Sequence, residues 1–225
     1  MHSAWPTIWD IALTILRWIA GLGVGVLLGL IIATLQTLVP GEQGSKRLNT
    51  WLTVAPLDFL RALPIIALVP LVQMISISER WKVALIAWAV MFPMYLSMRQ
   101  ARLRSLVDTE LALNAAGLSS LDIFRNYKLP KALGGLLKGV EISIGIAWLS
   151  VVAAEWVGTF SEGFWAGGLG YKITKAHEAN NWSSMLICLA LFGLLGTSTA
   201  WTWRILFTKE RALANGFNPL RNDEE

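Results

Sequence analysis

Few side chains in this 225-residue chain could do covalent or metal chemistry. The single cysteine, Cys188, sits in an apolar run, where we expect a small packed side chain rather than a reactive thiol. The only histidines are His2 and His177, so a zinc site has no Cys/His cluster to build on. The sequence has no Gly-x-x-x-x-Gly-Lys-Ser/Thr motif, so it cannot hold ATP by that route. We therefore expect no catalytic residue, no metal site and no cofactor in this chain, which is not an enzyme by itself.

One carboxylate stands out, because Glu155 follows directly on the apolar run 142–154. An ionisable group at membrane depth is expensive and marks a functional site by default. A structural role is equally open, in which Glu155 pairs with a basic residue or a Trp N–H.

The composition is that of a membrane protein. Hydrophobic residues make up 55% of the chain, the mean hydropathy is +0.54, and only 15% of the residues are charged. Soluble domains carry about 25% charged residues. We expect one all-α domain over residues 1–225, in contact with lipid. The net charge of +4 does not indicate nucleic acid, because the basic residues flank apolar spans and form no separate domain.

Five membrane spans are predicted. They cover residues 18–39, 62–78, 83–98, 132–158 and 182–203. The first and last carry no charge over a length that crosses about 30 Å of hydrocarbon, so we expect them to face lipid. The middle three contain prolines or charges, which neighbouring helices or a water-lined path must satisfy.

The distribution of basic residues predicts the orientation. The segments 40–61, 99–138 and 204–225 hold 14 of the 19 Lys and Arg residues. By the positive-inside rule these segments are cytoplasmic. The N-terminus is then outside, and the C-terminal tail (residues 208–225) is inside.

The loop at residues 108–130, here called the coupling loop, predicts two short helices with a glycine between them. Asp108 can cap the first helix, and Gly117 can end it in a left-handed conformation. Ser119 and Asp122 have the spacing of a capping box that begins the second helix. Apolar residues then recur every three positions, at Leu118, Leu121, Phe124 and Tyr127, and Leu129-Pro130 closes the unit. On these grounds a loop that lies on the membrane and a loop that docks a partner are equally favoured.

The coupling loop resembles the E-A-A-x3-G-x9-I-x-L-P motif of ABC importer permeases. It matches at Ala112, Gly117, Leu129 and Pro130, and it departs at Leu111, Leu113 and Tyr127. Segments 56–72 and 91–96 before the loop, and 148–158 and 167–176 after it, are similar to the nitrate, taurine, alkanesulfonate and bicarbonate permease group. The resemblance covers roughly residues 10–207.

The resemblance implies a type I ABC importer permease core of five spans, with cytoplasmic coupling helices, in the bacterial inner membrane. Its partners would be two cytoplasmic ATPase subunits, a second permease copy in a homodimer or heterodimer, and an extracytoplasmic solute-binding protein. The residues expected to act in ATPase coupling are Ala112, Gly117, Leu118, Leu121, Phe124, Leu129 and Pro130. The Gly-Gly-Leu-Gly run is similar to an outer re-entrant segment, which makes Glu155, Gly168 and Gly170 candidates for the pathway or its gate.

The solute and the class of transporter leave alternatives open. An anion such as nitrate, a sulfonate, taurine or bicarbonate fits the resemblance, and a small heterocyclic precursor stays open. Typical members carry a further N-terminal span, which we do not expect here. An ion-coupled secondary transporter or channel subunit is the main alternative, and inverted repeats, of which we see none, would support it. A non-transporting scaffold is disfavoured by the polar, proline-broken central spans.

Overall fold

The computed structural model describes residues 5–38, 56–75, 78–103, 112–113, 115–157 and 167–207, and all regular secondary structure within them is helical. In chain order, the helices include α1 (Ile8–Leu38), α3 (Ile65–Ile75), α4 (Glu79–Leu103), α6 (Ser120–Ile123), the π-helix η1 (Phe124–Lys128), α7 (Leu129–Val157), α8 (Leu169–Glu178) and α9 (Trp182–Leu206). Within this described part, the all-α prediction is confirmed.

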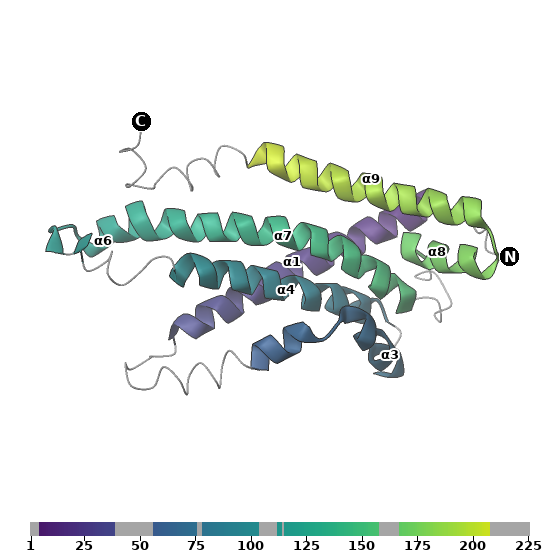
Figure 1. Cartoon of the computed structure of the whole chain (residues 1–225), viewed down its shortest axis with the longest axis horizontal. Helices are drawn as coiled ribbons and strands as arrows, with labels where there is room; N and C mark the ends of the chain where they lie inside the picture. The colour runs from purple at the N-terminus through teal and green to yellow at the C-terminus, as the bar shows by residue number, and fades with distance from the viewer. Residues whose placement is uncertain are drawn as a thin grey trace.

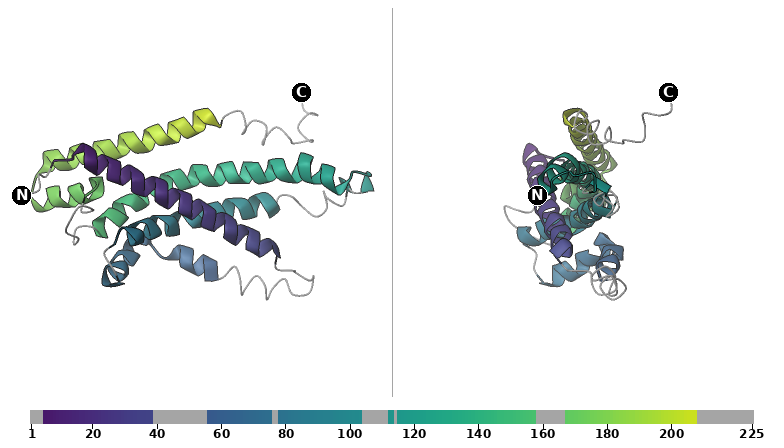
Figure 2. Two further views of the ribbon diagram at one scale, coloured as in Figure 1. Left: turned by 180° about the vertical axis from the view of Figure 1, so that it is seen from behind. Right: turned by 90° about the vertical axis from the view of Figure 1, so that its left-hand side faces the viewer.

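The long helices form an elongated bundle. In Figure 1, α7 and α4 run side by side, and α1 crosses both, as the view from behind in Figure 2 also shows. Glycines allow these close crossings: a Cβ added at Gly25 of α1 would lie 2.6 Å from Val90 Cβ of α4. At Gly139 of α7, an added Cβ would lie 2.7 Å from Met94 Sδ. Small residues at such positions are typical of helices that pack within a membrane.

The predicted second span, residues 62–78, is not one continuous helix. Residues 56–62 are helical, the helix is interrupted at Leu63 and Pro64, and α3, which follows, has only 11 residues. Such a helix is about 16 Å long, short of the roughly 30 Å of hydrocarbon. The break follows from Pro64, which has no N–H to donate and disfavours helical geometry at the residue before it. Four helices of the described residues, rather than five, are long and apolar enough to cross a membrane: α1, α4, α7 and α9.

Helix α1 begins ten residues before the predicted start of the first span. Its start is capped by Thr7 and Asp10, since the Thr7 N–H donates to Asp10 Oδ2 at 2.8 Å and the Asp10 N–H donates to Thr7 Oγ1 at 3.3 Å. The prediction of an uncharged first span is therefore wrong at this end. The extra turns bring Asp10 and Arg17 into the helix, where both are buried.

The core lies where α1, α4 and α7 meet. Ile86 and Val90 of α4 and Val151 of α7 are fully buried there. Helix α9 is attached through Trp148, which packs edge-on against Phe192 with ring centroids 6.0 Å apart. The most apolar stretches of α1 and α9 are only 17% and 11% buried, against 56% for α4. These exposed apolar faces agree with the prediction that the first and last spans face lipid.

Candidate functional site

Six charged side chains from four helices meet near the end of the bundle where α8 lies, here called the α8 end (Figure 1). This ion cluster consists of Asp10 and Arg17 of α1, Glu79 and Lys82 of α4, Glu155 of α7 and Lys172 of α8. Five of the six residues are buried, and the Glu79 side chain is 26% exposed. The cluster holds three acids and three bases, so its formal charges balance. Buried charges are tolerated when they are paired in this way.

Glu155 is completely buried. Its Oε1 accepts hydrogen bonds from Thr14 Oγ1 at 2.8 Å and from Arg17 Nη1 at 3.0 Å. Its Oε2 accepts the Gly170 N–H at 2.7 Å. Of the two roles left open by the sequence, the structure supplies the basic partner that the structural role requires. A gating role is compatible with the same contacts.

Arg17 connects the elements of this end. Its Nε and Nη2 donate to the two Glu79 oxygens at 2.8 and 2.9 Å, which is the paired geometry in which Arg binds a carboxylate best. Its Nη1 donates to Glu155 and, at 2.6 Å, to the Gly167 carbonyl. Lys82 donates to Glu79 from the next turn of α4. One guanidinium therefore joins α1, α4, α7 and the chain that enters α8.

Residues 167–170, here called the glycine segment, are held by side chains of α1 and α7. The Gly168 N–H donates to Asp10 Oδ1 at 3.1 Å, and the Leu169 N–H donates to Thr14 Oγ1 at 2.9 Å. Gly168 has φ +114°, a conformation that favours glycine. A Cβ there would overlap the Glu155 carboxylate and the Arg17 guanidinium. The structure thus brings together the three predicted gate candidates, Glu155, Gly168 and Gly170.

The other members of this site were missed by the sequence analysis. A signal existed for α1, because positions 10, 14 and 17 are spaced by four and three residues and share one helix face. Three polar residues on one face of an otherwise apolar helix indicate a buried polar contact. Their partners could not be predicted from the sequence, because Glu155 is 138 residues from Arg17.

The coupling loop has the predicted glycine turn. Gly117 has φ +85°, and the Leu118 N–H donates to the Leu113 carbonyl at 3.2 Å across the turn. A hydrogen bond from an N–H to the carbonyl five residues earlier is typical of a helix that ends at a glycine. The Ala116 N–H donates to the Ala112 carbonyl at 2.9 Å. The predicted Asp108 cap lies outside the described residues.

The second helix begins as predicted and ends differently. The Asp122 N–H donates to Ser119 Oγ at 3.2 Å, so Ser119 caps the second helix as predicted, and Ser119 Oγ donates to Asp122 Oδ2 at 2.6 Å. The prediction that Leu129-Pro130 closes the unit is wrong. Helix α6 continues through the π-helix η1 into α7, which begins at Leu129. Because Pro130 cannot donate to the carbonyl one turn earlier, a locally wider turn is the expected adjustment.

The apolar side chains of the loop are exposed. Leu121 is 73% exposed and Leu118 and Leu129 are about 40% exposed, whereas Ile123 is buried. The Phe124 side chain lies outside the described residues. Helix α6 lies at the end of the bundle opposite α8, as Figure 1 shows. The bundle therefore carries an exposed apolar projection at one end and a buried ion cluster at the other.

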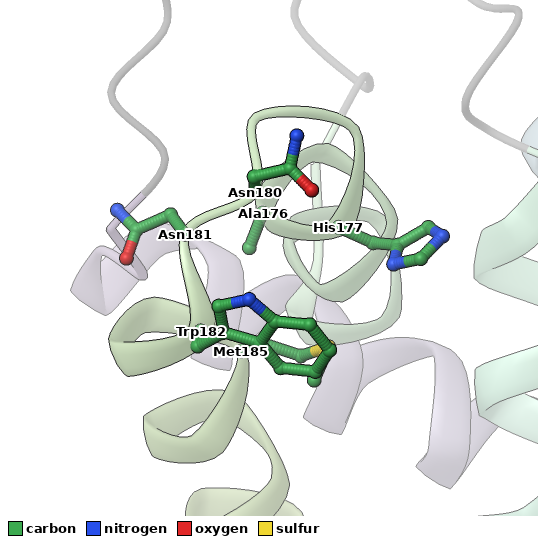
Figure 3. Close-up of a pocket in the computed structure, with 6 residues that line it drawn as sticks. All are labelled: Ala176, His177, Asn180, Asn181, Trp182 and Met185. Carbon is green, nitrogen blue, oxygen red and sulfur yellow. The ribbon is translucent and has the colours of Figure 1, made fainter.

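A small pocket between α8 and α9 has a different character. It is lined by Ala176, His177, Asn180, Asn181, Trp182 and Met185 (Figure 3). Its cavity volume of about 10 Å³ is far below the roughly 300–1,000 Å³ of ligand pockets. Asn181 Oδ1 accepts the Ser184 N–H at 3.1 Å and so caps α9. These residues form a capped turn between two helices.

The described part of the chain is a bundle with four helices long and apolar enough to cross a membrane, and it carries a glycine-bent helical projection at one end (Figure 1). Residues 25–211 match the family model described as the binding-protein-dependent transport system inner membrane component, and the chain belongs to this family. A chain of the MetNI methionine ABC transporter, solved in inward-facing conformations, has a TM-score of 0.60 at 18% identity, covering 90% of this chain and 93% of that one. The fold is therefore the type I ABC importer permease fold.

Curated relatives carry transport names. SsuC of Escherichia coli K12, an aliphatic sulfonates transport permease protein by name, is 32% identical over 143 residues, which are 62% of this chain and 51% of SsuC. SsuC of Bacillus subtilis 168 is 31% identical over 201 residues, or 86% of this chain and 64% of that protein. The nitrate import permease protein NrtB of Synechococcus elongatus is 36% identical over 96 residues, or 40% of this chain and 32% of NrtB. This chain thus spans less than two thirds of the length of each.

Proposed function

We propose that this chain is the permease subunit of an ATP-driven, binding-protein-dependent importer of a small anion. The observation that carries the proposal is the family match over residues 25–211. The relatives named for aliphatic sulfonates and for nitrate favour an anionic solute. Nitrate, a sulfonate, taurine or bicarbonate are the solutes to test first.

The coupling loop is proposed to dock on a cytoplasmic ATPase subunit. Leu118 and Leu121 present exposed apolar surface beside the Gly117 turn, and full burial of one such side chain stabilises a complex by about 1.5–3 kcal/mol. Phe124 would extend the same surface, and Ala112, Leu129 and Pro130 would shape the two arms of the turn. ATP hydrolysis would belong to two such partner subunits.

The complete transporter is proposed to contain a second permease copy and an extracytoplasmic solute-binding protein. The positive-inside rule places the coupling loop and the tail at 208–225 in the cytoplasm and the N-terminus outside. The α8 end then faces outward. Closure of the ATPases would move the coupling loops and part the helices at the α8 end, where Glu155, Gly168 and Gly170 would form part of the gate.

The test is co-purification followed by reconstitution. The tagged chain should bring down an ATPase subunit, and the complex should hydrolyse ATP faster with the loaded binding protein. Leu121→Asp, which charges the docking surface, should reduce ATPase recovery at least tenfold. Asn126→Asp adds the same charge at another exposed position of this helical unit and should leave recovery unchanged.

Two results would contradict the proposal. Solute transport by the purified chain without any ATPase would assign it to the secondary transporters or channels. Equal ATPase recovery with Leu121→Asp and with Asn126→Asp would remove the apolar surface from the docking site.

A further inference from the structure

We propose that Arg17 is the positioning residue of the α8 end: its guanidinium holds α4, α7 and the glycine segment in one arrangement, and this end opens only when its contacts to Glu79 and Glu155 part. The inference deepens the proposed function, on which it rests for the meaning of opening. It assigns a role to the first helix, which the coupling loop and the gate candidates leave without one.

Arg17 bonds to three different elements at once. Its guanidinium donates hydrogen bonds to Glu79 on α4, to Glu155 on α7 and to the Gly167 carbonyl. The side chain is only 3% exposed, so water does not compete for these donors. A lysine at this position would offer one ammonium, which cannot pair with both Glu79 oxygens and also reach the other two elements. The arrangement is specific to a planar guanidinium.

The neighbouring charges are paired more locally. Glu79 also has Lys82 three residues away on its own helix. Lys172 of α8 lies 3.7 Å from Asp10 of α1. Arg17 bonds both to a carboxylate of α4, Glu79, and to a carboxylate of α7, Glu155. Loss of Arg17 would remove the guanidinium that is bonded to the buried Glu155 carboxylate, and breaking a buried ion pair in this way is strongly destabilising, which favours hydration of this end.

The contacts of Arg17 act as a unit. Glu155 and Gly167 both accept from the same Nη1 atom, so one nitrogen of Arg17 bonds α7 and the glycine segment to α1. Asp10 and Thr14 fix the same segment from the preceding turns of α1. The part of α1 from Asp10 to Arg17 therefore holds the glycine segment in place, with Arg17 as its main contact.

The experiment measures the accessibility of two buried positions on one face of α7. Ala154 lies beside Glu155 and Ala147 lies two turns deeper, and both are completely buried. Each is changed to cysteine in the Cys188→Ser background, and labelling by an impermeant thiol reagent is timed in broken membranes that expose both faces. Arg17→Gln should speed labelling of Ala154→Cys at least tenfold and leave Ala147→Cys unchanged. Arg17→Lys should act in the same direction, because it keeps the charge and loses the geometry.

The matched control is Lys175→Gln, which removes an exposed ion pair with Glu178 on α8 and should leave both rates unchanged. Combining Arg17→Gln with Glu155→Gln should label Ala154→Cys no faster than Arg17→Gln alone, since the two groups act together.

Three outcomes would overturn the proposal. Continued protection of Ala154→Cys in Arg17→Gln would show that the contacts do not hold this end. Wild-type rates in Arg17→Lys would show that the guanidinium geometry is dispensable. Equal acceleration at both cysteines would make Arg17 a residue of the whole fold. The assay needs no ATPase and no binding protein, so a failure of the importer assignment would be seen separately, in the co-purification.

Discussion

Replacing Gly168 by alanine tests the packing of the glycine segment directly. The residue has φ +114°, and an alanine forced to keep such a conformation stores about 1–3 kcal/mol of strain. The added Cβ would also overlap the Glu155 carboxylate and the Arg17 guanidinium, and overpacking of this kind costs about 1–3 kcal/mol. We therefore expect Gly168→Ala to destabilise the protein by about 2–6 kcal/mol.

The matched control is Gly145→Ala in the middle of α7. A Cβ at Gly145 meets nothing within 4 Å, and alanine is a better helix former than glycine by about 1 kcal/mol. Thermal unfolding in detergent can be followed by the fluorescence of the 12 tryptophans. For a chain of this size each kcal/mol corresponds to about 2–4 °C, so Gly168→Ala should lower the Tm by about 4–24 °C. Gly145→Ala should hold or raise it.

Equal Tm values for Gly168→Ala and Gly145→Ala would mean that the segment before α8 can move away from Glu155 and Arg17 at no cost, which would contradict the prediction. The ion cluster would then not fix the position of α8, and the contacts of α1 would not hold the glycine segment in place.

The remaining predictions concern orientation, coupling and the gate. A cysteine at Ser119, in the Cys188→Ser background, should react with an impermeant thiol reagent only after cells are opened, and labelling of intact cells would reverse the orientation. Gly117→Val should abolish transport while the permease still reaches the membrane, because a β-branched residue resists φ +85°, and normal transport would remove the turn from the mechanism. Glu155→Ala should raise basal ATPase activity and weaken its dependence on the loaded binding protein, whereas Glu155→Gln should still assemble. Wild-type stimulation in both Glu155 variants would leave the carboxylate with a structural role alone.

The parts of the fold that follow local rules could be predicted from the sequence. The turn at Gly117 and the helix cap at Ser119 depend on residues within one or two turns, and both are present. The core of α9 could be placed because nothing charged interrupts its apolar run. The break at Pro64 and the continuation through Pro130 obey the same proline chemistry with opposite results. The outcome depends on whether a neighbouring turn can widen, which the local sequence does not state.

The ion cluster could be predicted only in part. A search for uncharged spans starts the first helix after Arg17, because it assumes that lipid surrounds every residue of the span. The assumption fails because the polar side chains of this part of α1 are buried against α4 and α7, and the helix begins at Ile8. The sequence identifies Glu155 as a carboxylate that is costly to bury. Its partner, however, is determined by the way α1 crosses α7. That crossing is a property of the whole bundle.

Helix α6 continues without a break through η1 into α7, so a tilt at the coupling loop would move the far end of α7. With 29 residues, α7 is about 44 Å long, and it ends two residues after Glu155. If its foot is tilted by about 5°, a rod of this length moves its far tip by roughly 4 Å. The contacts of Glu155 with Thr14, Arg17 and Gly170 span only 2.7–3.0 Å. Under the proposed function, a displacement of this size at the far end of α7, relative to α1 and α8, would exceed the length of these hydrogen bonds.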